Sequence, residues 1–356
     1  MLRVVLIALL LAPPCFGWGG KEHVQFTRMA AARLLADPDT PPAMKQWLGR
    51  IVPVILDDAG ERQFLLTARV RTDLNNSGGG VLYWVMEPDH RAQNDPRTLT
   101  RPPFDRHERL MHYIDLEFFH PGESRRRYQD DLSGKPPIES IPRDWRDPRY
   151  VRAGYLPFAL EHAFRQLVQA IRAGRLAPQE GVGNSDDDTA MRWAGYLAHY
   201  AQDNTQPHHS TIDYKSQSYF ADPLRAPNVH AEFEWRLVDD EHREFPELRQ
   251  QYWEHFTAAL REGHDPIQTE DVWRATLEVC YISYDALPLI GRAAAASVVQ
   301  GSPNQPPSLD TERFFCFRGH YRGREMSVLE LKARQTAWAV LRTQRLWLAA
   351  WHEATR

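Results

Sequence analysis

Hydrophobic residues along much of this chain recur every three or four positions, the spacing that places them on one face of an α-helix. In one such segment, Met191, Ala194, Leu197, Ala198 and Ala201 follow this spacing. The alternation of apolar and polar positions that marks a strand is scarce. The pattern predicts helices over His23–Leu35, Met44–Leu56, Arg62–Val70, Leu156–Ala173, Thr189–Asp203, His230–Asp240, Thr269–Val299 and Ser327–Trp351.

Long irregular stretches separate these helices. Residues 75–80 read NNSGGG, and residues 91–105, 121–149 and 302–308 are rich in proline. Such stretches fit surface loops around a helical core better than linkers between domains. We find no internal repeat, so we expect an all-α fold with a single multi-helix domain over residues 18–356.

The first seventeen residues have the pattern of a signal peptide. Arg3 supplies a positive start, Val4–Ala12 is an unbroken apolar run, and small Gly17 precedes Trp18. The run is shorter than the roughly 20 residues that a membrane-spanning helix needs, and no later stretch is long and charge-free enough to cross a membrane. We therefore expect cleavage before Trp18 and a secreted or periplasmic protein.

Composition narrows the function only slightly. The formal net charge is −4, which weakly disfavours broad, non-specific binding to nucleic acid. Cys280 and Cys316 remain after residue 17 and could pair in an oxidising compartment, but two cysteines do not make a disulfide scaffold.

The most specific chemical pattern is LAHYAQDNTQPHHS. His199 and Asp203 stand four positions apart on a predicted helix, so both side chains leave the same face. Pro207 ends the helix and places His209 on the turn that follows. Imidazole nitrogen and carboxylate oxygen are common zinc ligands. The spacing His-x3-Asp-x5-His is rare by chance in this composition, and it predicts a metal site.

A second pair, His230 and Glu234, has the same four-residue spacing in NVHAEFEWRL. Taken alone, such a pair is more often an exposed hydrogen bond on a helix. Its position shortly after His209 favours a metal ligand instead. His209 and Asp213 form a further pair of this kind, which we discount because such pairs are expected by chance.

Two other places complete a possible ligand set. Cleavage after residue 17 would free the α-amino group of Trp18, which can chelate a metal together with its own carbonyl oxygen, and His23 follows closely. Farther along, Asp89 stands in EPDH and His112 in the mostly apolar segment MHYIDLEFF. A lone histidine in an apolar run usually belongs to the core, but here the other candidates need a partner.

In this order, the motifs resemble a superfamily of three-zinc enzymes. It joins bacterial zinc-dependent phospholipases C with the single-strand-specific zinc nucleases of fungi and plants. The motifs are the tryptophan at the expected mature N-terminus, an early histidine, Pro-Asp, His-Tyr-Ile-Asp, His-x3-Asp-x5-His and His-x3-Glu. The resemblance runs from Trp18 to about Glu234, and it implies the all-helical fold of that superfamily.

The resemblance also implies three zinc ions. The step from Asp89 to His112 is longer than the family pattern, so Asp95 is an alternative to Asp89. The implied ligands are Asp89, His112, His199 and Asp203 for the first site; the Trp18 amine and carbonyl, His23 and Asp203 for the second; and His209, His230 and Glu234 for the third.

The reaction implied by the resemblance is hydrolysis of a phosphate ester by a metal-activated water, with Asp89 orienting or deprotonating that water. No motif for a serine nucleophile is present. Glu234 resembles the phospholipase branch and favours a phospholipase C-like phosphodiesterase, whereas the short step from Trp18 to His23 resembles the nuclease branch. A single-strand-specific nuclease and a non-catalytic secreted zinc-binding protein are the alternatives. We expect a monomer acting on a phospholipid or single-stranded nucleic acid.

Aromatic residues near these motifs could stack a base or surround a choline ammonium. The more economical interpretation assigns most of them to the core. A basic run at Arg125–Arg127 is read as a solvated loop. The aromatic residues are Tyr83, Trp84, Phe104, Phe118 and Phe119.

Overall fold

The structure is a computed structural model. It describes residues 18–52, 80–93, 100–101, 104–120, 132–176, 189–238, 244–263, 265, 267, 269–301 and 307–356. The predicted signal peptide, the predicted helix Arg62–Val70, the alternative ligand Asp95 and the basic run Arg125–Arg127 lie outside the described residues.

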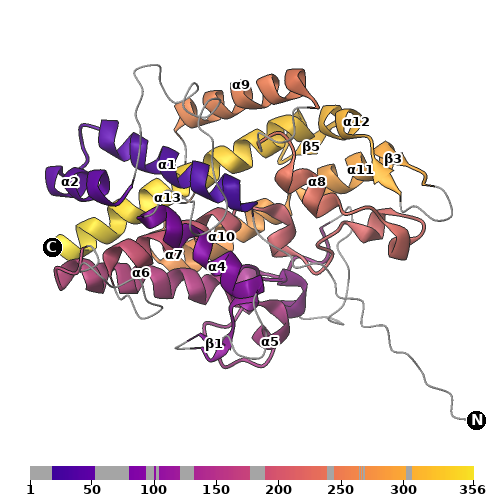
Figure 1. The fold of residues 1–356 in the computed structure, drawn as a ribbon. Coiled ribbons are helices and arrows are strands. Elements are labelled where there is room, and N and C mark those ends of the chain that lie inside the picture. The colour runs from indigo at the N-terminus through magenta and orange to yellow at the C-terminus, as the bar shows by residue number, and fades with distance from the viewer. Residues whose placement is uncertain are drawn as a thin grey trace, which may run out of the picture.

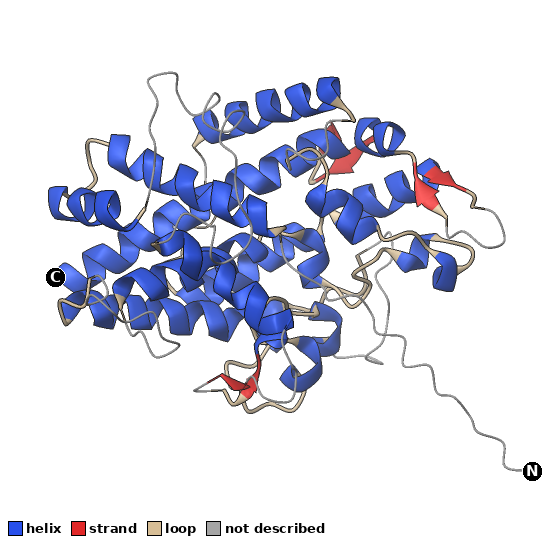
Figure 2. Cartoon of the chain, in the orientation of Figure 1, coloured by secondary structure: helices blue, strands red, loops and turns tan. Residues whose placement is uncertain are grey.

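Helices dominate the described part of the chain, and the predicted all-α class is confirmed (Figure 2). The strands are short antiparallel pairs: β1 (Thr100–Arg101) with β2 (Arg106–His107), β3 (Val298–Val299) with β4 (Ser308–Leu309), and β5 (Arg318–Tyr321) with β6 (Arg324–Ser327). The helices are α1 (Gly20–Ala36), α2 (Pro42–Ile51), α4 (Val81–Gln93), α5 (Tyr150–Ala153), α6 (Leu156–Arg172), α7 (Ala190–Asp203), α8 (Val229–Trp235), α9 (Pro246–Glu262), α10 (Val272–Tyr284), α11 (Leu287–Ser297), α12 (Thr311–Cys316) and α13 (Val328–Thr355).

Four of these helices, α1, α6, α7 and α13, lie within a few residues of the predicted ranges. The predicted helix Thr269–Val299 instead divides into α10 and α11, because Pro288 lacks an N–H and its ring opposes continuation of the preceding turn. The helix predicted to reach Asp240 ends at Trp235. The sequence pattern does not predict helices α4, α5, α9 and α12.

The long helix α13 packs against α1, α6, α7 and α9 and runs through the centre of the fold (Figure 1). A capping box between Ser327 and Glu330 fixes its N-terminus. Its C-terminal half joins an apolar cluster with α4, α6 and α7, and its N-terminal half joins another with α8, α9 and α11. The expectation of a single domain stays a prediction.

Helices α4 and α7 lie unusually close together. A Cβ atom added at Gly195 of α7 would stand 2.5 Å from the Cβ of Trp84 and 2.8 Å from the backbone nitrogen of Val85 in α4. Only glycine permits this approach without a shift. The contact brings the Asp89 end of α4 to the face of α7 that carries the candidate ligands.

The aromatic residues near the motifs pack in or against the core, and Cys280 and Cys316 do not form a disulfide. Trp84, Phe104 and Phe119 are buried in the core, and Tyr83 and Phe118 pack against it, so these rings serve the core. Cys280 is buried, Cys316 is exposed, and both are free thiols. Among the described helices, none combines the length and apolar character needed to cross a membrane.

Candidate metal centre

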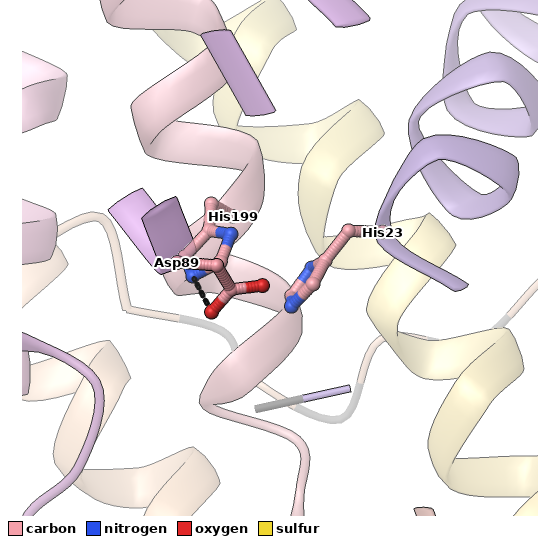
Figure 3. A group of neighbouring side chains, drawn as sticks. All are labelled: His23, Asp89 and His199. Carbon is pink, nitrogen blue, oxygen red and sulfur yellow. Dashed lines mark ion pairs between the residues drawn. The ribbon is translucent and has the colours of Figure 1, made fainter. Parts of the chain in front are cut away.

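Histidine and aspartate side chains from four separate segments meet in the interior. His199 and Asp203 come from the last turns of α7, His23 from α1 and Asp89 from α4. His112 follows the short 3-10 turn Glu108–Met111. Each of the five is at most 4 % exposed. Figure 3 shows the Asp89 carboxylate and the rings of His23 and His199 turned toward one another.

Asp203 is the centre of this group because its two oxygens face different histidines. Oδ1 lies 3.3 Å from Nε2 of His23. Oδ2 lies 2.9 Å from Nδ1 of His112 and 3.2 Å from Nε2 of His199. One carboxylate therefore spans two sets of ring nitrogens, the arrangement expected of a ligand that bridges two cations.

Asp89 also lies near two of these nitrogens. Its Oδ1 lies 3.8 Å from Nε2 of His199 and 4.0 Å from Nδ1 of His112. Two groups emerge whose ligand atoms all lie within 4.8 Å of one another: His23, Asp89 and His199, and His112, His199 and Asp203. Each could hold a metal ion.

Hydrogen bonds on the outer side of the rings decide which nitrogen faces inward. Nδ1 of His199 lies 2.8 Å from the carbonyl oxygen of Val85, and Nδ1 of His23 lies 2.7 Å from Oε1 of Gln202. A carbonyl oxygen only accepts, so Nδ1 donates and Nε2 keeps its lone pair in the neutral ring. Gln202 is itself held in this orientation, since its Nε2 donates to Thr27. Outer-shell contacts of this kind fix metal-binding histidines.

The consequence is a buried group of acceptors that face acceptors. Nε2 of His23, Oδ1 of Asp89 and Oδ1 of Asp203 have no hydrogen-bond partner among the described residues. Buried polar atoms without partners are costly, by about 1–3 kcal/mol each. A cation would satisfy these atoms together, so the residues present fit a metal of the kind that nitrogen and oxygen ligands bind.

The charge balance agrees with this interpretation. Burial raises the pKa of Asp203, but the nearby His199 and the hydrogen bond from Nδ1 of His112 outweigh it and hold the pKa well below the ordinary range. Burial lowers the pKa of His112, and Asp203 outweighs it in turn, so the pKa of His112 is raised. Asp203 is therefore ionised at neutral pH, as a metal ligand must be.

The predicted third site lies beside this group. His230 and Glu234 share one face of α8, and their Nε2 and Oε2 atoms are 2.7 Å apart. The ring of His209 lies 5.3 Å from that of His230, and its Nδ1 donates to the carbonyl of His112, 2.7 Å away. Burial and the nearby charge of Glu22 raise the pKa of Glu234 well above its usual value. A bound cation would offset that penalty.

Trp18 is fully buried next to the same helix end. Its indole nitrogen donates to the carbonyl of Gln202, at 2.9 Å, and its ring lies 6.0 Å from that of Phe233 in α8. The side chain thus ties the expected mature N-terminus to the residue before Asp203. The role of the Trp18 amine and carbonyl as ligands stays a prediction.

A cavity of about 180 Å³ opens beside the third site. His209 and His230 form part of its wall, together with Arg109, Tyr113 and Tyr214. A larger cavity, of about 320 Å³, lies among α9, β5, β6 and α13. Its lining contains none of the candidate ligands, so the smaller cavity is the one that bears on chemistry at the centre.

His208 also lines the smaller cavity, although none of the sequence motifs points to it. Its ring stacks on that of His230 at 5.2 Å, its Nε2 lies 3.1 Å from Oγ of Ser216, and its Nδ1 has no hydrogen-bond partner within the described chain. Burial and the adjacent His209 lower the pKa of His208 to about 3, so its ring is neutral. The only sequence signal was its place beside His209.

The fold and this centre define an all-helical protein with a buried histidine and aspartate cluster that could hold metal ions. Comparison with models of known protein families gave no match, and comparison with curated protein sequences gave none either. The case for a function therefore rests on the motifs and on the geometry of the centre.

Proposed function

We propose that this protein is a zinc-dependent phosphodiesterase of the phospholipase C type. The observation that carries the proposal is the convergence of buried ring nitrogens on both oxygens of Asp203, beside His209 and His230, which line a cavity. Zinc is the metal that best suits a set of neutral imidazoles and carboxylates. Three ions follow from the resemblance to the three-zinc enzymes.

Three side chains of the site have defined roles in this proposal. Asp203 would bind cations through both of its carboxylate oxygens, and Asp89, whose Oδ1 lies 3.8 Å from Nε2 of His199, would orient the attacking water. Bound zinc would supply an activated water and offset the negative charge of the phosphate. Arg109, in the wall of the cavity, offers a guanidinium group to phosphate oxygens.

The rest of the cavity supports a phospholipid substrate in this proposal. The rings of Tyr113 and Tyr214 line it, and aromatic faces bind a quaternary ammonium group such as that of choline. Glu234 as the last acidic ligand supports the same branch. The second candidate is a single-strand-specific nuclease, because the same tyrosine rings also suit stacking of a base. A secreted or periplasmic monomer that begins at Trp18 after cleavage belongs to this proposal.

Metal content of the purified protein beginning at Trp18 is the first test. We expect about three zinc ions per chain by elemental mass spectrometry, and fewer after His199→Ala substitution. The matched control is His352→Ala, at an exposed position near the end of α13, which should keep all three. A content of zero or one zinc ion per chain after reconstitution would refute the three-metal mechanism.

The zinc-loaded protein is then assayed on a phosphatidylcholine analogue and, in parallel, on single-stranded DNA. Faster hydrolysis of the phosphatidylcholine analogue would support the phospholipase proposal. Cleavage of DNA alone would support the single-strand-specific nuclease instead. A protein that holds three zinc ions and hydrolyses neither class would be a non-catalytic zinc-binding protein.

A further inference from the structure

The helix that carries His230 and Glu234 is too short to be stable on its own. Helix α8 spans seven residues, Val229–Trp235, and helices of this length are marginal without tertiary support. Its last carbonyl groups have no partners inside the helix. After Trp235 the chain turns extended at Arg236 and left-handed at Leu237, with φ of 76°. Glu234 therefore stands at an end that something else must fix.

The group that contacts this end is a buried lysine of the neighbouring helix α13. Lys332, in the first turns of α13, is fully buried. Its Nζ donates to the carbonyl oxygens of Phe233 and Glu234, both at 2.7 Å, and to that of Arg236. An ammonium group has three N–H bonds, so each has one carbonyl acceptor. All three carbonyls belong to the end of α8 or the residue just after it.

The same ammonium group also contacts the aromatic rings around the expected N-terminus. It lies 5.8 Å from the ring centroid of Trp18 and 5.9 Å from that of Tyr252, within the range of cation–π attraction. Burial lowers the pKa of Lys332 to about 7, whereas the carboxylates of Glu22 and Glu234 act in the opposite direction. The three carbonyl acceptors fit the charged form.

We propose that Lys332 is a positioning residue for the third metal site: it holds the C-terminal end of α8 so that Glu234 stays beside His230. This inference rests on the proposed function, because it assigns a task to Lys332 within that site. Its physical basis is that Lys332 makes three charged hydrogen bonds to one short helix end. Without them the residues after His230 would be free to unwind, and Glu234 would move away from its partner.

The test compares Lys332→Met with Arg342→Met. Arg342 is a buried cation on the same helix, 1 % exposed, whose partner is Asp265 rather than α8. We expect Lys332→Met to weaken zinc binding at one site roughly 10- to 100-fold, the usual effect of removing an outer-shell partner. The other two zinc ions should remain. Arg342→Met should lower stability and keep all three ions at unchanged affinity.

A second readout is independent of metal. In the metal-free protein, hydrogen exchange of the amides in residues 229–238 should become roughly 10- to 100-fold faster in Lys332→Met, the factor for losing a charged hydrogen bond. Exchange in α10 should not change. If Lys332→Met does not fold, Lys332→Arg serves instead. Its planar donors cannot meet three carbonyls in the same way, so a smaller loss at the same single site is expected.

The outcomes separate this inference from the proposed function. Three zinc ions of unchanged affinity in the folded Lys332 variants, with unchanged exchange in residues 229–238, would overturn the inference and leave the proposed function standing. A wild-type protein without zinc would overturn the proposed function. Even then, faster amide exchange confined to residues 229–238 in Lys332→Met, compared with the wild type, would still support Lys332 as the group that holds this helix end. Equal zinc loss in the Arg342 variant would also overturn the inference.

Discussion

Replacement of Asp203 with asparagine is expected to remove two of the three proposed zinc ions and to leave the third. The side chains have nearly the same shape, so the buried space stays filled. What changes is the ligand. Oδ1 of Asp203 faces His23 at 3.3 Å, and Oδ2 faces His112 and His199 at 2.9 and 3.2 Å. An amide keeps one oxygen and loses the negative charge that both sets of nitrogens share.

The size of the effect follows from the ligand count. Structural zinc binds with roughly 10–16 kcal/mol, shared among about four ligands. One ligand then contributes about 3 kcal/mol, or about 100-fold in affinity. At a free zinc concentration ten times the wild-type dissociation constant, each of the two affected sites would be only about 10 % occupied. The stoichiometry should therefore fall from about three to about one.

Equilibrium dialysis at that zinc concentration, followed by elemental mass spectrometry, measures this stoichiometry. The matched control is Asp213→Asn. Asp213 is also a buried carboxylate, but it accepts the backbone N–H groups of Gln217 and Ser218, at 2.7 and 3.0 Å, in the loop before α8. It should keep all three ions. For comparison, Glu234→Gln should lose one.

Two results would refute this reasoning. If Asp203→Asn loses only one zinc ion, the carboxylate does not serve two sites, and the first and second sites must be reassigned. If Asp213→Asn loses zinc to the same extent, the loss reflects general destabilisation of the loop and helix end. Circular dichroism of both variants shows whether the helical fold is retained.

Three further predictions concern packing and titration. Gly195→Ala forces α7 away from Trp84, 2.5 Å from the new Cβ, and should lower the free energy of unfolding by about 1–3 kcal/mol in urea titration; wild-type stability would contradict the close contact. Burial raises the pKa of Glu117 to about 7, so in the metal-free protein this group contributes a loss of stability as pH rises from about 4.5 to 7, whereas buried His208, with its pKa lowered to about 3, contributes a gain. The free energy of unfolding of Glu117→Gln should therefore rise more steeply with pH than that of the wild type over this range; an unchanged slope would contradict this. In the chain beginning at Trp18, a thiol reagent should modify exposed Cys316 in the native state and buried Cys280 only after unfolding, whereas two native thiols would refute the burial.

The helical class and the pairs His199–Asp203 and His230–Glu234 were readable from the sequence because they depend on local geometry. Apolar residues every three or four positions must lie on one helix face, and residues four apart must lie one turn apart. The same local reasoning was weaker where proline intervened. Helix α4 contains Pro88 and was not predicted, and the break at Pro288 was missed.

The assembly of the centre was decided by tertiary structure. His23, Asp89 and His112 are far from α7 in sequence, and only the packing of α1 and α4 on α7, and of the turn Glu108–Met111 on α4, brings them to Asp203. The close approach at Gly195 is part of that packing. The resemblance to known enzymes supplied these residues as candidates, but periodicity could not place them.

The supporting contacts were invisible in the sequence for the same reason. Val85 holds His199 through a backbone carbonyl, which every residue has, and Lys332 looks like one more charged residue on a long helix. Its burial and its three carbonyl partners arise only when α13 passes the end of α8. Local spacing determined which candidate ligands share a helix face, whereas long-range packing determined which atoms around them hold those side chains in place.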